Sequence, residues 1–124
     1  MWKLVSGRII QTTDETRIKF RTNISQEILE KLEELSERHN THSNYLLENG
    51  LWNVLAAGVI EFDKNLRPAD RIQYKTTYDK ELLESVKEFA KDHKLFINDV
   101  IEYSVGYIDF KDIKTKEHKN RLES

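Results

Sequence analysis

Cationic side chains alternate with apolar ones in two short stretches of the chain, Arg17 to Thr22 and Arg71 to Thr76. Successive side chains of an extended strand point to opposite faces. The pattern therefore predicts two strands, each with an apolar inner face and a polar outer face. Donors and positive charge on an outer face suit an anionic partner that is rich in acceptors, such as a nucleic acid. The predicted outer residues are Arg17, Lys19, Arg21, Arg71, Gln73 and Lys75.

The two stretches belong to a longer internal repeat. Residues 16–52 align with residues 70–106 at a shift of 54 without a gap, and ten of the 37 pairs are identical. A strand–helix–helix unit of about 40 residues therefore occurs twice. One such unit would bury too little surface and leave both strand edges unpaired. Two units remove both problems if their strands pair antiparallel and their four helices pack beneath.

Helical periodicity follows each predicted strand. Ser25 is a suitable N-cap for the first helix, and Asn40 can adopt the left-handed conformation that ends it. A second, largely apolar helix is expected to start within residues 41–44, to run to Leu55 and to lie in the middle of the core. The matching helices are expected over 79–93 and 98–108. Trp52 and Tyr107 are expected to pack in the core.

These elements divide the chain into an N-terminal extension (1–15), a first unit (16–55), a connector (56–69), a second unit (70–108) and a polar tail (109–124). The two units are expected to form one domain, mainly α-helical with a two-stranded antiparallel β-ribbon. In the extension, Ser6-Gly7 is compatible with a small hairpin, although we favour a segment that packs Trp2 and Ile9 onto the body. The connector has the composition for a short strand at Val59 to Phe62.

Composition restricts the class of protein. The 124 residues are 38% hydrophobic and 34% charged, with a net charge of −2, so any preference for an anionic partner depends on where the charges lie. The first helix is acidic, with a net charge of −3 over residues 25–39, and this offsets the basic strands. The chain has no cysteine, no signal-like start and no apolar run of about 18 residues. We therefore expect a cytoplasmic protein without a membrane partner, a cofactor or a metal site.

The repeated unit resembles the ribbon-helix-helix family of DNA-binding proteins, which includes the Arc and MetJ repressors. The resemblance covers residues 16–55 and 70–108, and it depends on the alternating basic strand, the Leu-rich acidic first helix and the polar turn at residues 40–44. Family members are normally homodimers of one unit, whereas two fused units resemble certain plasmid-conjugation accessory proteins. The resemblance implies a tandem pseudo-dimer in one chain. Its ribbon would enter the major groove of double-stranded DNA, and the six outer residues would contact bases.

The resemblance also implies phosphate contacts at the start of each second helix, by Thr41, His42, Ser43, Asn44, Lys94 and Asn98. The second unit departs from the polar pattern at Leu95, Phe96 and Ile97. Either its phosphate clamp is weaker, or these apolar residues contact a neighbouring chain or the N-terminal segment. The two strands also differ where Lys19 matches Gln73, which predicts an asymmetric DNA subsite.

The expected function is sequence-specific binding of double-stranded DNA, most simply as a transcriptional repressor or autoregulator of a plasmid or phage, located on the bacterial nucleoid. Several chains are expected to associate on adjacent sites. One alternative is an accessory DNA-binding protein of a conjugation relaxosome. Another is an antitoxin-like interaction module whose tail, from Asp109, captures a partner. An enzyme is disfavoured because no nucleophile stands out and small helical units leave little room for a pocket.

Overall fold

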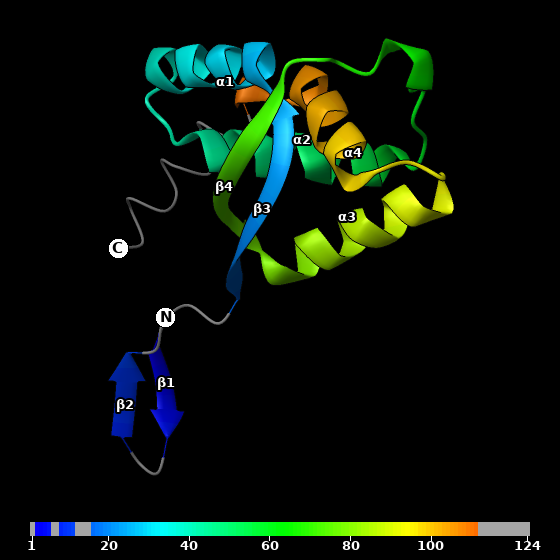
Figure 1. The fold of residues 1–124 in the computed structure, drawn as a ribbon. Helices are drawn as coiled ribbons and strands as arrows, with labels where there is room; N and C mark the ends of the chain where they lie inside the picture. The colour runs from blue at the N-terminus through cyan, green and yellow to red at the C-terminus, as the bar shows by residue number, and fades with distance from the viewer. Residues whose placement is uncertain (1, 6–7, 12–15, 112–124) are drawn as a thin grey trace.

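The computed structural model describes residues 2–5, 8–11 and 16–111 (Figure 1). Strands β1 (Trp2–Val5) and β2 (Arg8–Gln11) pair antiparallel, so the extension forms the hairpin that we considered the less favoured alternative. Whether Trp2 and Ile9 pack onto the body lies outside the described side chains. The part of the predicted tail beyond Lys111 also lies outside the described residues.

Strands β3 (Arg17–Ser25) and β4 (Arg71–Asp79) form a two-stranded antiparallel ribbon. Arg21 pairs with Lys75 at the centre, and the pairs run outward from it to Arg17 with Asp79 and Ser25 with Arg71. Equivalent residues of the two units differ by 54 in residue number. When each residue is exchanged for its equivalent, every cross-strand pair becomes another cross-strand pair of the ribbon, and the central pair becomes itself. Both strands run three residues beyond the predicted ends, since each continues directly into the residue that caps the next helix.

All helices begin at matching positions of the two units, and the first helices also end at matching positions. Helix α1 (Gln26–Arg38) corresponds to α3 (Lys80–Asp92), and α2 (Ser43–Ala57) begins 54 residues before α4 (Ile97–Ser104). Ser25 caps α1 by accepting the Ile28 N–H, and the side chain of Asp79 caps α3 in the same way.

Both first helices end in the left-handed region, at Asn40 with φ 50° and at Lys94 with φ 57°. The prediction for Asn40 is therefore confirmed. Helix α4 is shorter than its counterpart α2, because α4 tightens at its end into the 3₁₀ turn η2 (Val105–Tyr107).

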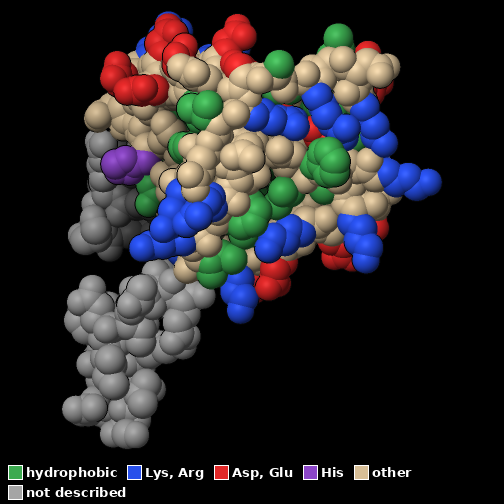
Figure 2. Space-filling view, in the orientation of Figure 1, with side chains coloured by type: hydrophobic (Ala, Val, Ile, Leu, Met, Phe, Trp, Pro, Cys, Tyr) green, Lys and Arg blue, Asp and Glu red, His purple; other side chains and the backbone are tan. Residues whose placement is uncertain are grey.

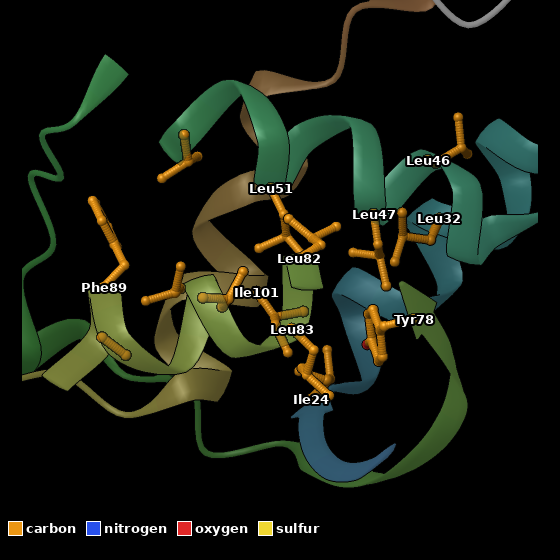
Figure 3. Packing of buried hydrophobic residues seen from close by; sticks show 14 residues of the cluster. Ile24, Leu32, Leu46, Leu47, Leu51, Tyr78, Leu82, Leu83, Phe89 and Ile101 are labelled. Atoms are coloured by element: carbon orange, nitrogen blue, oxygen red, sulfur yellow. The ribbon is translucent and has the colours of Figure 1, made fainter. Parts of the chain in front are cut away.

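The ribbon lies on a helical layer. Figure 1 shows β3 and β4 crossing in front of α2, with α1 continuing from one end of the ribbon and α3 from the other. The core contains apolar side chains from both strands and all four helices. In Figure 3, Leu51 points toward Leu82, and Tyr78 lies beside Leu47. Each fully buried side chain of this kind contributes roughly 1.5–3 kcal/mol. The predicted mainly helical fold with a two-stranded antiparallel ribbon is confirmed.

Two local predictions are wrong. No strand forms at Val59 to Phe62, because no described strand pairs with this segment. Val59 is 68% exposed, and the connector continues into the 3₁₀ turn η1 (Lys64–Leu66). Trp52 and Tyr107 are 46% and 45% exposed, so they lie at the surface rather than in the core. Helix α2 is nevertheless as central as predicted, since residues 46–51 and Val54 are all buried.

Candidate nucleic-acid interface

The outer face of the ribbon carries six polar side chains in three cross-strand pairs. Lys19 lies opposite Thr77, Arg21 opposite Lys75, and Asn23 opposite Gln73. All are exposed except Thr77, which is half-buried. Their alternate neighbours are buried or half-buried, apart from Ile72, which is 44% exposed. We call this set the outer grid. A strand rises about 3.3 Å per residue, so three alternate residues span roughly 13 Å along the ribbon.

No ion pair to a described acidic residue neutralises the cations of the outer grid. Within the described residues, Lys19, Arg21 and Lys75 make no ion pair. Figure 2 shows a group of Lys and Arg side chains beside the lower half of the ribbon, whereas Asp and Glu gather along the upper edge over α1. The fold thus places basic and acidic side chains on different parts of the surface, although their charges nearly cancel in the net charge of the chain. Such a separation creates a local positive potential on a protein of net charge −2.

Arg17 and Arg71, predicted as outer residues, make ion pairs with the second helix of their own unit. Arg17 pairs with Glu48, and its guanidinium lies 5.5 Å from the Tyr45 ring. Arg71 pairs with the equivalent Glu102 at 2.6 Å. Their side chains are only 23% and 16% exposed. Both arginines therefore tie a ribbon end to a helix, and they are less available to a ligand than the outer grid.

The Arg71 end of the ribbon contains a larger ion-pair cluster. The fully buried carboxylate of Asp99 accepts hydrogen bonds from Arg67 at 2.7 Å and from Arg71 at 2.7 Å. Burial tends to raise the pKa of Asp99, but the hydrogen bonds from Arg67, Arg71 and the Phe96 N–H outweigh it and lower that pKa below its ordinary value. Hydrogen bonds to Glu102 and Asp99 raise the pKa of Arg71 despite its burial.

The starts of the two second helices differ. At α2 the N-cap His42 makes no side-chain cap, and the flanking residues are polar. At α4 the Asp99 carboxylate accepts the backbone N–H of Phe96 at 2.9 Å, so the helix start already holds a negative group of its own. The Arg67 guanidinium lies 4.4 Å from the Phe96 ring and covers this end. An outside anion would meet different surroundings at the two helices.

The predicted phosphate ligands surround these helix starts. Asn44 and Asn98 lie closest to the ribbon: Asn44 donates to the Thr77 backbone oxygen at 3.5 Å, and Asn98 donates to the equivalent oxygen of Asn23 at 3.2 Å. His42 and Lys94 are exposed, and Ser43 is half-buried. Thr41 is half-buried, and its hydroxyl has no hydrogen-bond partner within the described part of the chain.

Asn23 and Thr77 are outer-grid residues that sequence reasoning missed. The signal was available, because the alternation that placed Arg17, Lys19 and Arg21 outside continues to Asn23. We ended each predicted strand three residues too early, at Thr22 and Thr76, since Asn23 and Thr77 carry no charge to mark a functional face. The buried acids Glu48, Asp99 and Glu102, which hold the arginines, were also missed, because they are distant from them in sequence.

Other kinds of site find no support in the described residues. They contain no group of three or more His, Cys, Asp or Glu side chains able to hold a metal ion. None of their helices is long and apolar enough to cross a membrane. In comparisons with known proteins, no family model, no curated protein and no solved structure matches the chain.

Proposed function

We propose that this protein binds double-stranded DNA in a sequence-specific manner, by inserting the β3–β4 ribbon into the major groove. The major groove, about 12 Å wide, admits a two-stranded β-ribbon, and base edges there present a unique pattern of donors and acceptors. The observation that carries the proposal is the outer grid. Three cations that make no ion pair with any described residue, and two amides, stand exposed on a ribbon whose other face is anchored in the core.

The fold also supports the resemblance to the ribbon-helix-helix family. Both units begin their helices at equivalent residues, and the strand register is symmetric about Arg21 and Lys75. The chain would then be a tandem pseudo-dimer, in which fusion replaces association of two copies by an intramolecular contact. The backbone bonds at the ribbon ends agree with this symmetry, because Gln26 N–H donates to Asp70 and Lys80 N–H donates to the equivalent Thr16.

We revise which side chains read bases. Arg17 and Arg71 pair with buried carboxylates, and turning either one toward DNA would leave Glu48 or Glu102 without its partner. We therefore assign base reading to Lys19, Arg21, Asn23, Gln73, Lys75 and Thr77. Arg and Lys donate to guanine O6 and N7, and Asn and Gln pair with adenine N6 and N7.

Phosphates flanking the ribbon would be held at the start of α2, where backbone N–H groups at a helix N-terminus suit an anion. Thr41, His42, Ser43 and Asn44 surround that start. At α4 the carboxylate of Asp99 competes for the same place, so Lys94 and Asn98 would supply a weaker contact. A chain that occupies an operator in this way would act as a transcriptional repressor in the cytoplasm, and further copies could bind adjacent sites.

The test is to replace Lys19, Arg21 and Lys75 together by Ala. We expect the triple variant to lose sequence-specific binding, with affinity for a selected operator falling at least 100-fold in a mobility-shift or anisotropy titration. The matched control replaces three exposed lysines outside the ribbon, Lys31, Lys64 and Lys91, by Ala. It changes the net charge equally and should weaken binding only slightly. The proposal fails if the ribbon variant, folded by circular dichroism, still binds as the wild type does.

The genomic position of the binding site would define the biological role. Footprints over a promoter support a repressor, and footprints beside a nick site support a conjugation accessory protein. The antitoxin-like interaction module would instead be supported if a second protein co-purifies with the full chain and no longer does so when residues 112–124 are deleted.

A further inference from the structure

The two ends of the outer grid differ chemically. One end holds Lys19 and Thr77, and we call it the lysine end. The other holds Asn23 and Gln73, and we call it the amide end. The 54-residue shift exchanges Lys19 with Gln73 and Asn23 with Thr77, so a symmetric pair of identical units would present the same residues at both ends. Only the central pair, Arg21 and Lys75, keeps its character under this exchange.

The difference matters because the two ends offer different hydrogen-bonding groups. The ammonium of Lys19 only donates, and it suits the paired acceptors O6 and N7 of guanine. The amides of Asn23 and Gln73 both donate and accept, and this matches the N7 acceptor and N6 donor of adenine. A lysine cannot accept from adenine N6, so the two ends prefer different base pairs.

The helix starts differ in the same direction. Asn44 connects the start of α2 to Thr77 at the lysine end, and Asn98 connects the start of α4 to Asn23 at the amide end. Asp99 fills the start of α4 with its own carboxylate. The helix start beside the amide end is thus already occupied by a carboxylate that Arg67 and Arg71 neutralise, whereas Lys19 at the lysine end makes no ion pair within the described residues. Both differences orient the protein on DNA in one direction.

We infer that the protein recognises a non-palindromic DNA site in a single orientation, with guanine under the lysine end and adenine under the amide end. The inference rests on the proposed function, since it assumes that the outer grid lies in the major groove. It goes further in assigning a base type to each end and a direction to the bound chain. A homodimer of identical units could not read such a site with both halves equally satisfied.

The experiment selects binding sites for the full chain from a library of random DNA duplexes and sequences the bound fraction. The wild type should enrich a motif without dyad symmetry, with guanine preferred near one end and adenine near the other, each by about 5- to 100-fold over the other bases. Two double variants make the ends alike. Lys19→Gln with Thr77→Asn should enrich a palindrome with adenine at both ends, and Asn23→Thr with Gln73→Lys should enrich one with guanine at both ends.

All four replaced residues belong to the outer grid, so the core is untouched, and the circular-dichroism spectrum of each variant is to be compared with that of the wild type to check that it is folded. The inference is overturned if the wild type enriches a palindrome, or if either folded double variant keeps the wild-type motif. DNA recognition by the ribbon would survive the first of these results. If the wild type enriches no motif at all, the proposed function itself fails, so the two failures are distinguishable.

Discussion

Gly50 of α2 lies against Ser104 of α4, and the two are equivalent residues of the repeated units. A Cβ added to Gly50 would overlap the carbonyl oxygen of Ser104 and stand 3.0 Å from its carbonyl carbon. The second helices therefore cross near the centre of the molecule at backbone contact. The contact requires Gly in the first unit, whereas the equivalent position of the second unit holds Ser, so the two units differ at this contact.

Gly50→Ala should destabilise the fold. The added methyl meets backbone, which cannot rotate away, and overpacking of this kind costs about 1–3 kcal/mol, more than the helix propensity of Ala returns. The measurement is the free energy of unfolding in urea. Gly106→Ala is the matched control, since a Cβ there meets nothing within 4 Å. Equal stabilities of the two variants would contradict the close helix crossing.

Tyr78→Phe should stabilise the fold by about 1 kcal/mol. Tyr78 is fully buried, and its hydroxyl has no hydrogen-bond partner among the described residues, so it loses its hydration without replacement. Burial also raises the pKa of Tyr78. Tyr74→Phe is the control, because its hydroxyl bonds to Thr76. A loss of stability in Tyr78→Phe greater than in Tyr74→Phe would show that the buried hydroxyl is satisfied.

Asp99 should make the fold sensitive to acid. Its folded-state pKa lies below the unfolded value of about 3.9, so the ionised carboxylate stabilises the fold above that pH. This stabilisation is lost as the pH falls through the folded-state pKa. Urea unfolding between pH 7 and pH 2.5 should show a steeper loss for the wild type than for Asp99→Asn.

At pH 7 the same variant should be less stable than the wild type by about 2–4 kcal/mol, because Arg67 and Arg71 lose their charged partner. The control is Glu34→Gln, which breaks the exposed pair with Arg38 and should change stability by less than about 1 kcal/mol. Equal effects of the two substitutions would mean that the Asp99 cluster is no stronger than a surface pair.

Tyr45→Asp should weaken DNA binding, because it places a carboxylate in α2 where α4 has Asp99. The new carboxylate would accept the His42 N–H and repel a phosphate at that helix start. We expect affinity to fall about 10-fold at low salt, and the salt dependence of binding to decrease by about one phosphate contact. Tyr45→Asn is the control, because Asn has the size of Asp but no charge. It also removes the ring near Arg17, as Tyr45→Asp does. If both variants bind equally well, α2 does not clamp phosphate.

Much of the fold could be predicted because its signals are local. The alternation in each strand, the cap Ser25 and the left-handed Asn40 all concern neighbouring residues, and their conformations agree with the prediction or extend it. The connector was predicted less well. Val59 to Phe62 has a strand-like composition, but none of the described strands pairs with it, and composition alone does not specify a pairing partner.

The outer grid was predicted only in part. Arg17 and Lys19 look equivalent in the sequence, both cationic and two residues apart. In the structure, Glu48 reaches Arg17 from another helix, whereas no described acid reaches Lys19. Which cation is neutralised depends on contacts between residues 28 or more apart in the sequence, and the alternation within a strand carries no information on such contacts.

The sequence by itself determined that the chain contains two strand–helix–helix units, that their strands carry cations on one face, and that the total charge hides this distribution. Periodicity and repetition are sufficient for these conclusions, because they depend on residue type and spacing alone. Only the tertiary structure decided the strand register, the withdrawal of Arg17 and Arg71 into ion pairs, and the capping of α4 by Asp99. The register depends on pairing between strands of different units, and the ion pairs join residues at least 28 apart in the sequence. Asp99 caps a helix start only three residues away, but Arg67 and Arg71, which lie 32 and 28 residues from it, hold its carboxylate there. Residue type and spacing along the chain do not specify such contacts.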